Sequence, residues 1–379
     1  MEFLMNARHF ILPAIMAIFL VSGCSKQFTL PRADIMTPPS WQYPRKDIGA
    51  GAVIKSDFGG QLNLIWQKKN SESPLGPLTI GAGKLIYCGS RSRIFFYDLA
   101  TGDYLGMYKA RYGVQSGVVV SDSLAYFAVG QTKNRLICLN LLNRKVSWAF
   151  NIKDVTGAPI IIENRLYAGS SDGKLICLNK KTGEELWQYP AEGRCLAGPS
   201  GDGEMVFFPQ DNGTILGLKA ATGDKIFEAE LDQPLVTKAV IGEKVYLTGS
   251  EGGFFALDRS SGNIVWKKTF PYPIWTSPAL DNGMLYFGDN GGNLMALAET
   301  DGETLWQFRA DGVIVSSPIV VGDYLLFASL DRNLYCLDKD TGELVSKREF
   351  KRGINFPAVS DGKVICVAAH DGTIQCFGD

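Results

Sequence analysis

The residues that could do chemistry in this chain are few, and the first of them, Cys24, indicates a covalent modification. An apolar run of 11 residues, Ile11–Val21, precedes it and is followed by the small residues Ser22 and Gly23. A bilayer span would need about 20 apolar residues, whereas a short run that ends in small residues is typical of a secretory signal. We predict that residues 1–23 are a lipoprotein signal peptide and that Cys24 is acylated, with an ordinary secretory signal as the alternative.

Catalytic groups are scarce after Cys24. His370 is the one histidine that follows it, so no second histidine can share a metal ion, and a lone histidine is more often a surface residue than a general base. The sequence has no Gly-x-Ser-x-Gly elbow, no phosphate-binding glycine loop and no His-Glu-x-x-His pair. We therefore predict no catalytic residue, no metal and no cofactor, and a protein that is not an enzyme. Carboxylate pairs such as Asp154 with an aspartate from another part of the chain stay open.

A repeat of about 40 residues must position these groups. Each copy has an apolar run, a Gly-containing hairpin, a second apolar run and a turn of the Thr-Gly type. A fixed period of this size with four short strands per unit is typical of a β-propeller. The turns fall at Gly102, Arg144, Gly183, Gly223, Gly262, Gly302 and Gly342.

We predict an all-β fold, an eight-bladed β-propeller of four-stranded antiparallel blades. The last unit ends at Asp379 without its fourth strand, and the segment Leu62–Lys68 is a strand with no partner of its own. If this N-terminal strand completes the last blade, the ring closes and no sheet edge is left exposed. The propeller then covers residues 61–379. Residues 24–60, which are rich in Pro and Gly, are predicted to form a tether.

Large aromatic residues recur four positions after the turn in most units, whereas Gly106 and Ser346 break this pattern. A recurring aromatic residue on a strand is typical of packing between blades, because its burial removes a large apolar surface from water. We assign these side chains to stability rather than to ligand binding. They are Trp148, Trp187, Phe227, Trp266 and Trp306.

Cysteines are unusually frequent for an exported protein. Their number after Cys24 is odd, so at least one is unpaired in a monomer. Four of them fall at the repeat position that Ala256 and Ala296 hold, which favours small buried thiols over a disulfide framework. The seven are Cys88, Cys138, Cys177, Cys195, Cys336, Cys366 and Cys376.

The repeat pattern resembles the PQQ-like β-propeller repeat, with clear copies at 175–187, 255–266 and 294–306. Within that family, a single-domain lipoprotein of this length resembles the BamB group. Members of this group are the propeller subunit of the outer-membrane β-barrel assembly machinery. The resemblance implies a non-enzymatic scaffold, lipid-anchored in the outer membrane and facing the periplasm. It also implies binding to the periplasmic domains of the barrel-assembly protein. PQQ-dependent dehydrogenases share the repeat, but they are longer and usually carry adjacent cysteines, which this chain lacks.

The loops that link each blade to the next gather around the central channel of a propeller, and loops on a rigid scaffold commonly carry function. In this chain they are rich in Arg, Tyr and Trp, the usual anchors of protein interfaces. Trp275 lies outside the repeated aromatic position, so packing explains it less readily. The predicted partner-binding residues are Arg111, Tyr112, Arg194, Tyr272, Trp275, Arg309 and Arg352.

Composition narrows the class of partner. The formal net charge is −1 and no basic tract or basic-aromatic stripe occurs, so we predict no nucleic-acid partner. No second long apolar segment follows Cys24, so contact with the membrane is expected through the lipid only. Two other functions stay open: a cell-surface or envelope module that binds glycans or other ligands, and a quinone-linked oxidoreductase.

Overall fold

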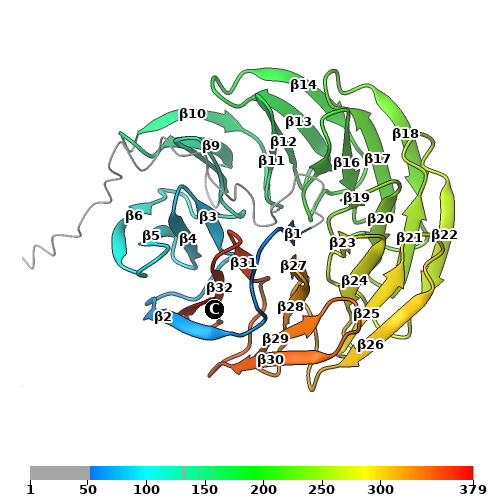
Figure 1. Cartoon of the computed structure of the whole chain (residues 1–379). Helices are drawn as coiled ribbons and strands as arrows, with labels where there is room; N and C mark the ends of the chain where they lie inside the picture. The colour runs from blue at the N-terminus through cyan, green and yellow to red at the C-terminus, as the bar shows by residue number, and fades with distance from the viewer. Residues whose placement is uncertain (1–51, 131–133, 144, 156, 379) are drawn as a thin grey trace, which may run out of the picture.

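The computed structural model describes residues 52–130, 134–143, 145–155 and 157–378, and this part of the chain is all-β. Eight sheets stand as blades arranged in a ring, as Figure 1 shows. The prediction of an eight-bladed propeller is confirmed. None of the described residues belongs to a helix that is long and apolar enough to cross a membrane.

Blades 1 to 4 follow the chain in order, each from its inner to its outer strand. Blade 1 contains β3 (Thr79–Gly81), β4 (Lys84–Gly89), β5 (Arg93–Asp98) and β6 (Tyr104–Lys109). Blade 2 contains β7 (Val119–Ser121), β8 (Leu124–Val129), β9 (Arg135–Asn140) and β10 (Val146–Asn151). Blade 3 contains β11 (Ile160–Ile162), β12 (Arg165–Gly169), β13 (Lys174–Asn179) and β14 (Glu185–Pro190). Blade 4 contains β15 (Ser200–Gly201), β16 (Met205–Pro209), β17 (Thr214–Lys219) and β18 (Lys225–Glu230).

Blades 5 to 8 complete the ring. Blade 5 contains β19 (Val240–Ile241), β20 (Val245–Thr248), β21 (Gly253–Leu257) and β22 (Ile264–Thr269). Blade 6 contains β23 (Ala279–Asp281), β24 (Met284–Gly288), β25 (Asn293–Ala298) and β26 (Thr304–Arg309). Blade 7 contains β27 (Ile319–Val321), β28 (Tyr324–Ala328), β29 (Asn333–Asp338) and β30 (Leu344–Glu349), with β1 (Val53–Ile54) added to its inner edge. Blade 8 contains β31 (Val359–Ser360), β32 (Ile365–Ala368), β33 (Thr373–Gly378) and β2 (Asn63–Lys69).

The apolar pattern explains which strands form the core. The two middle strands of a blade are buried on both sides, as in β12 and β13, because neighbouring blades cover both faces. The outer strand alternates instead, and in β14 the side chain of Trp187 points inward while its neighbours face solvent. Continuous apolar runs therefore form the inside of the ring and alternating ones its rim.

The ring closes as the sequence predicts. β2, from the N-terminal side, pairs antiparallel with β33, the last strand of the chain, and Trp66 lies opposite Cys376. Blade 8 thus joins two segments far apart in sequence and has no unpaired strand where the ends of the propeller meet.

The segment Ala52–Gly60 forms a strap that begins at the inner edge of blade 7 and lies in the range that composition assigned to the tether. β1 pairs in parallel with β27, and Ala52 and Ile54 are completely buried. The Ser56 Oγ donates to the carbonyl of Gly362, at 2.5 Å, and the Phe58 ring packs edge-on against Tyr324. Residues 52–58 therefore pack against blades 7 and 8.

The propeller has two faces with different kinds of turn. The loop face holds the loops between blades and the hairpins between the two middle strands, and these contact each other. The backbone N–H of Leu330, in one hairpin, donates to the carbonyl of Val313 in the preceding loop. In the next blade, the backbone N–H of His370 donates to the carbonyl of Gly353. The opposite turn face holds the Thr-Gly turns. Because β1 runs parallel to β27, it runs from the loop face toward the turn face.

The cysteines divide into two groups. Cys366 and Cys376 lie opposite each other on β32 and β33 and form a disulfide, so the prediction of buried thiols is wrong for these two residues. The prediction of buried thiols is confirmed for the other five described cysteines, which are buried and lie outside any disulfide: Cys88, Cys138, Cys177, Cys195 and Cys336.

Candidate interaction surface

The turn face is built from contacts that join each blade to the next. The indole Nε1 of Trp306 in blade 6 donates to the carbonyl of Lys339 in blade 7, at 3.1 Å. Its ring also covers Gly342, which has a left-handed φ of +74°, so that an added Cβ would lie 2.5 Å from the ring. Only glycine suits both the backbone and the close approach. The same indole-to-carbonyl bond joins Trp66 to Leu99, Trp148 to Lys180, Trp187 to Ala220 and Trp266 to Glu299, at 2.9–3.2 Å.

The exceptions follow the same geometry. Phe227 covers Gly262 but has no N–H to donate, and Arg259 at this blade junction instead forms an ion pair with Asp202. At the junction of blades 7 and 8, Ser346 takes the aromatic position and its hydroxyl donates to the carbonyl of Gly60 in the strap, at 2.6 Å. Blade 8 has no Thr-Gly turn, because its outer strand comes from the N-terminal side. The strap supplies the missing contact.

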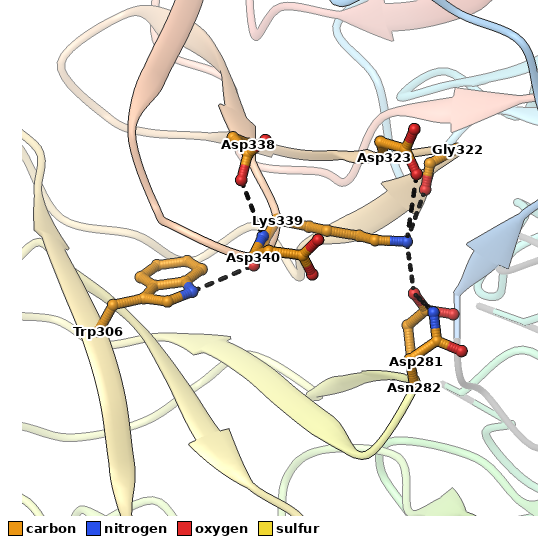
Figure 2. Close-up of polar contacts among 8 residues, drawn as sticks. All are labelled: Asp281, Asn282, Trp306, Gly322, Asp323, Asp338, Lys339 and Asp340. Carbon is orange, nitrogen blue, oxygen red and sulfur yellow. Dashed lines mark hydrogen bonds and ion pairs between the residues drawn. The ribbon is translucent and has the colours of Figure 1, made fainter.

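A buried ion pair adds to the contact between blades 6 and 7. Figure 2 shows Lys339 extended from its turn toward Asp281 of β23, with the Lys339 Nζ 2.9 Å from the carboxylate and 3.1 Å from the carbonyl of Gly322. Burial would lower the pKa of Lys339, but the bond to Asp281 and the charge of Asp323 raise it on balance. The Lys339 side chain therefore stays protonated in the folded protein although it is buried.

The loop face differs, since large side chains there are left in solvent. Trp275 is 53% exposed and Tyr272 43% exposed, both in the loop between blades 5 and 6. The Tyr272 ring covers Gly291 of the neighbouring hairpin, which fixes its position. Exposed Trp and Tyr side chains of this kind are typical interface anchors.

The predicted arginines are distributed over several blade junctions rather than gathered in one cluster. Arg194 donates to Asp211 of the next hairpin, with its Nε 2.6 Å from the carboxylate, yet its side chain remains 59% exposed. Arg111 lies over the ring of Tyr112, and Arg309 donates to the Asn293 side chain at 2.8 Å. Arg352 is exposed in the loop between blades 7 and 8. Together with Tyr272 and Trp275, these residues come from five blade junctions.

Sequence reasoning missed two residues of this face. Leu330 is 42% exposed at the tip of the hairpin in blade 7, and Arg332 in the same hairpin has a left-handed φ of +77°. The available signal was the absence of glycine from the hairpin sequence Ser329–Arg332, where most other hairpins have one.

The buried thiols have an environment that suppresses their reactivity. Burial raises the pKa of Cys88 and of Cys195 to about 12, and that of Cys138 to about 11. A thiol, unlike a thiolate, is a poor nucleophile and metal ligand. Within the described ranges, no group of three or more His, Cys, Asp or Glu residues could hold a metal ion.

These features define a class of protein: a repeat propeller with a closed ring, one interlocked face and one face of exposed anchors. A family model described as "Outer membrane protein assembly factor BamB" matches residues 106–240, 234–328 and 310–377. These matches span most of the chain, which therefore belongs to the BamB family.

Individual relatives agree with this assignment. BamB from Marinobacter adhaerens is 32% identical over 149 residues, which is 36% of this chain and 36% of that protein. BamB from Yersinia pestis is 22% identical over 291 residues, or 70% of this chain and 72% of that protein. The match thus spans about a third of the length of the first relative and about seven-tenths of the second.

Solved structures share the fold at low sequence identity. BamB from Moraxella catarrhalis has a TM-score of 0.71 and 15% identity, with 84% of this chain and 100% of that chain covered. A europium-containing methanol dehydrogenase has a TM-score of 0.76 and 12% identity, with 88% and 90% covered. These likenesses show the fold alone, and the fold is common to scaffolds and enzymes.

Proposed function

We propose that this protein is a non-enzymatic outer-membrane scaffold whose loop face binds the periplasmic domains of a barrel-assembly protein. The observation that carries the proposal is the difference between the two faces. Trp306 and its counterparts on the turn face bind neighbouring blades, whereas Trp275 and Tyr272 on the loop face are about half exposed. Membership of the BamB family supports the choice of partner.

The N-terminal sequence supports a location for this function. An acylated Cys24 would anchor the chain in the outer membrane, with the propeller in the periplasm, where the barrel-assembly domains lie. Two acyl groups or more at one site give stable anchoring, since each buried methylene contributes about 0.8 kcal/mol. Cys24 lies outside the described residues, so its acylation stays a prediction, which mass spectrometry of the mature N-terminus tests.

Replacement of two anchors tests the proposal. The double variant Trp275→Ala, Arg194→Ala should capture the purified periplasmic domains at least about tenfold more weakly, because anchor residues commonly contribute more than 1 kcal/mol each. The matched control is Tyr104→Ala, which removes a 45% exposed aromatic from an outer strand, away from the loop face. Unchanged capture by the double variant would remove these residues from the binding surface.

A second function has one observation in its favour. Exposed aromatic rings such as Trp275 also stack on sugar rings, so an envelope module for glycans would use the same loop. Binding of purified envelope glycans, without binding of the barrel-assembly domains, would favour this function. A quinone-linked enzyme would instead carry a bound chromophore, and we expect the purified protein to have no quinone absorbance.

A further inference from the structure

The hairpin between β28 and β29 differs from the other hairpins of the loop face at two positions. Arg332 stands where five other blades have a left-handed glycine, and Leu330 stands where those blades have a polar residue. The glycines at the equivalent position are Gly173, Gly213, Gly252, Gly292 and Gly372, with φ from +76° to +94°.

The backbone at Arg332 is strained. Its φ of +77° falls in the left-handed region, where the Cβ of an L-residue crowds the following carbonyl. Five other blades avoid this cost with glycine. A strained residue that the repeat itself does not require is a reason to look for a function of its side chain.

The Arg332 side chain is available to a partner. It is 53% exposed, and it pairs with Glu349 at 3.0 Å, whose side chain is 65% exposed. Exposed pairs of this kind contribute little to stability, so a carboxylate from outside can replace Glu349 at small cost. Arg332, Lys351 and Phe350 line one shallow pocket together with this Glu349, and the exposed Arg352 follows in the same loop.

The acid within this hairpin is directed into the fold. Asp331 accepts hydrogen bonds from the Tyr335 hydroxyl at 2.7 Å and from the backbone N–H of Asn333 at 2.9 Å. A further bond comes from the N–H of Asp311, at 3.2 Å. The Asp331 carboxylate is therefore satisfied locally, whereas Arg332, Lys351 and Arg352 face solvent.

Leu330 adds an apolar contact to this cationic group. Leu330 lies beside Gly353, in the loop that holds Lys351 and Arg352, because a Cβ added to Gly353 would lie 3.6 Å from the Leu330 side chain. The backbone N–H of Leu330 donates to the carbonyl of Val313. The hairpin is thus fixed between two loops, which keeps the leucine exposed in one place. A positioned apolar side chain beside several cations suits a partner with the opposite charge and an apolar group of its own.

We propose that Leu330, Arg332, Lys351 and Arg352 form a cationic–apolar corner that binds an acidic segment of a partner protein. The segment would place carboxylates on Arg332 and Lys351 and an apolar side chain against Leu330. The proposal goes beyond the proposed function, because it does not need the barrel-assembly protein to be the partner.

The variant Arg332→Gly separates binding from folding. It removes the cation and also restores the glycine that relieves the backbone, so the fold should become slightly more stable, with Tm raised by about 2 °C. Ser92→Gly is the matched control, because Ser92 has a left-handed φ of +66° in the hairpin of blade 1. It should raise Tm similarly and leave the corner intact.

The probe is a fluorescein-labelled, glutamate-rich peptide that contains leucine, measured by fluorescence anisotropy against a peptide with lysine in place of glutamate. We expect saturable binding of the acidic peptide by the wild type and by Ser92→Gly, weaker at higher salt, and about tenfold weaker binding by Arg332→Gly. The proposal is overturned if Arg332→Gly binds as well as the wild type, or if the lysine peptide binds equally. Absence of saturable binding up to about 1 mM would overturn it as well.

Discussion

Two turns of blade 7, at opposite ends of β29, show how one repeat unit serves both stability and binding. At the turn face, the turn after Asp338 buries the Lys339 side chain against Asp281 and receives the Trp306 indole. At the loop face, the hairpin before Asn333 leaves Leu330 and Arg332 in solvent. The turn-face end matches the repeat pattern, whereas the hairpin end departs from it.

The difference indicates where the sequence is constrained by the ring and where it is not. A turn-face residue contacts the next blade, so a change there alters a junction that the whole closed ring depends on. The hairpin of blade 7 on the loop face is held by backbone contacts to the neighbouring loops, while the Leu330 and Arg332 side chains remain in solvent. Binding residues are therefore expected on the loop face, and the comparison can be tested one residue at a time.

The largest loss of stability is expected from Trp306→Ala. The variant loses the bond to the Lys339 carbonyl and leaves a cavity above Gly342, and we expect the free energy of unfolding to fall by about 3 kcal/mol. Denaturation by urea, with the midpoint and slope both recorded, measures it. A loss below about 1 kcal/mol would mean that the turn face does not hold the blades together as described.

Lys339→Met should cause the second largest loss of stability. It leaves the Asp281 carboxylate, which is 14% exposed, without its cation, at an expected cost of about 2–3 kcal/mol. Because the pKa of Lys339 is raised in the fold, the stabilisation is fully present below the pKa of an unfolded lysine, about 10.4, and is lost as pH rises through the higher folded value. The difference between wild type and variant should thus be constant from neutral pH to about pH 9 and shrink under strongly alkaline conditions. A difference that grows with pH would contradict the ion pair.

The buried thiol of Cys336, on β29 between the two turns, reports which turn holds the strand. Labelling of a buried thiol requires opening of the structure, so its rate follows local stability. We expect Trp306→Ala to accelerate labelling of Cys336 by about tenfold or more and Arg332→Gly to leave it unchanged or slower. Mass spectrometry of labelled peptides distinguishes Cys336 from the other cysteines. Equal acceleration by both variants would remove the distinction between the turns.

The smallest effect on stability is expected from Trp275→Ala. The side chain is 53% exposed and lies outside the repeated aromatic position, so the free energy of unfolding should change by no more than about 0.5 kcal/mol. Urea denaturation beside Trp306→Ala gives the comparison directly. A loss similar to that of Trp306→Ala would assign Trp275 to packing and not to binding.

The sequence predicts the ring well because its evidence repeats. Eight copies of one pattern predict the blades, and the unpartnered strand before the first copy predicts the closure through β2. Features that occur once are harder to see. The pairing of Val53 and Ile54 with β27 depends on an open inner strand edge, which a Pro- and Gly-rich composition does not indicate.

The exposed residues of the loop face were predicted only in part, for a related reason, and their role in binding stays a prediction. The loops could be named from their position in the repeat, and Tyr272 and Trp275 from their type. The exposure of Leu330 and the strained backbone of Arg332 depend on the conformation of one hairpin, and the disulfide depends on the register that places Cys366 opposite Cys376. Neither conformation nor register is visible in residue type alone.

The central claim is that the loop face, and not the turn face, binds the partner. A photo-reactive amino acid at position 275 and, in a separate variant, at the exposed turn-face position 340 tests it in intact cells. We predict crosslinks from position 275 to the periplasmic domains of the barrel-assembly protein, identified by mass spectrometry, and none from position 340. Crosslinks to that protein from position 340 alone would contradict the claim.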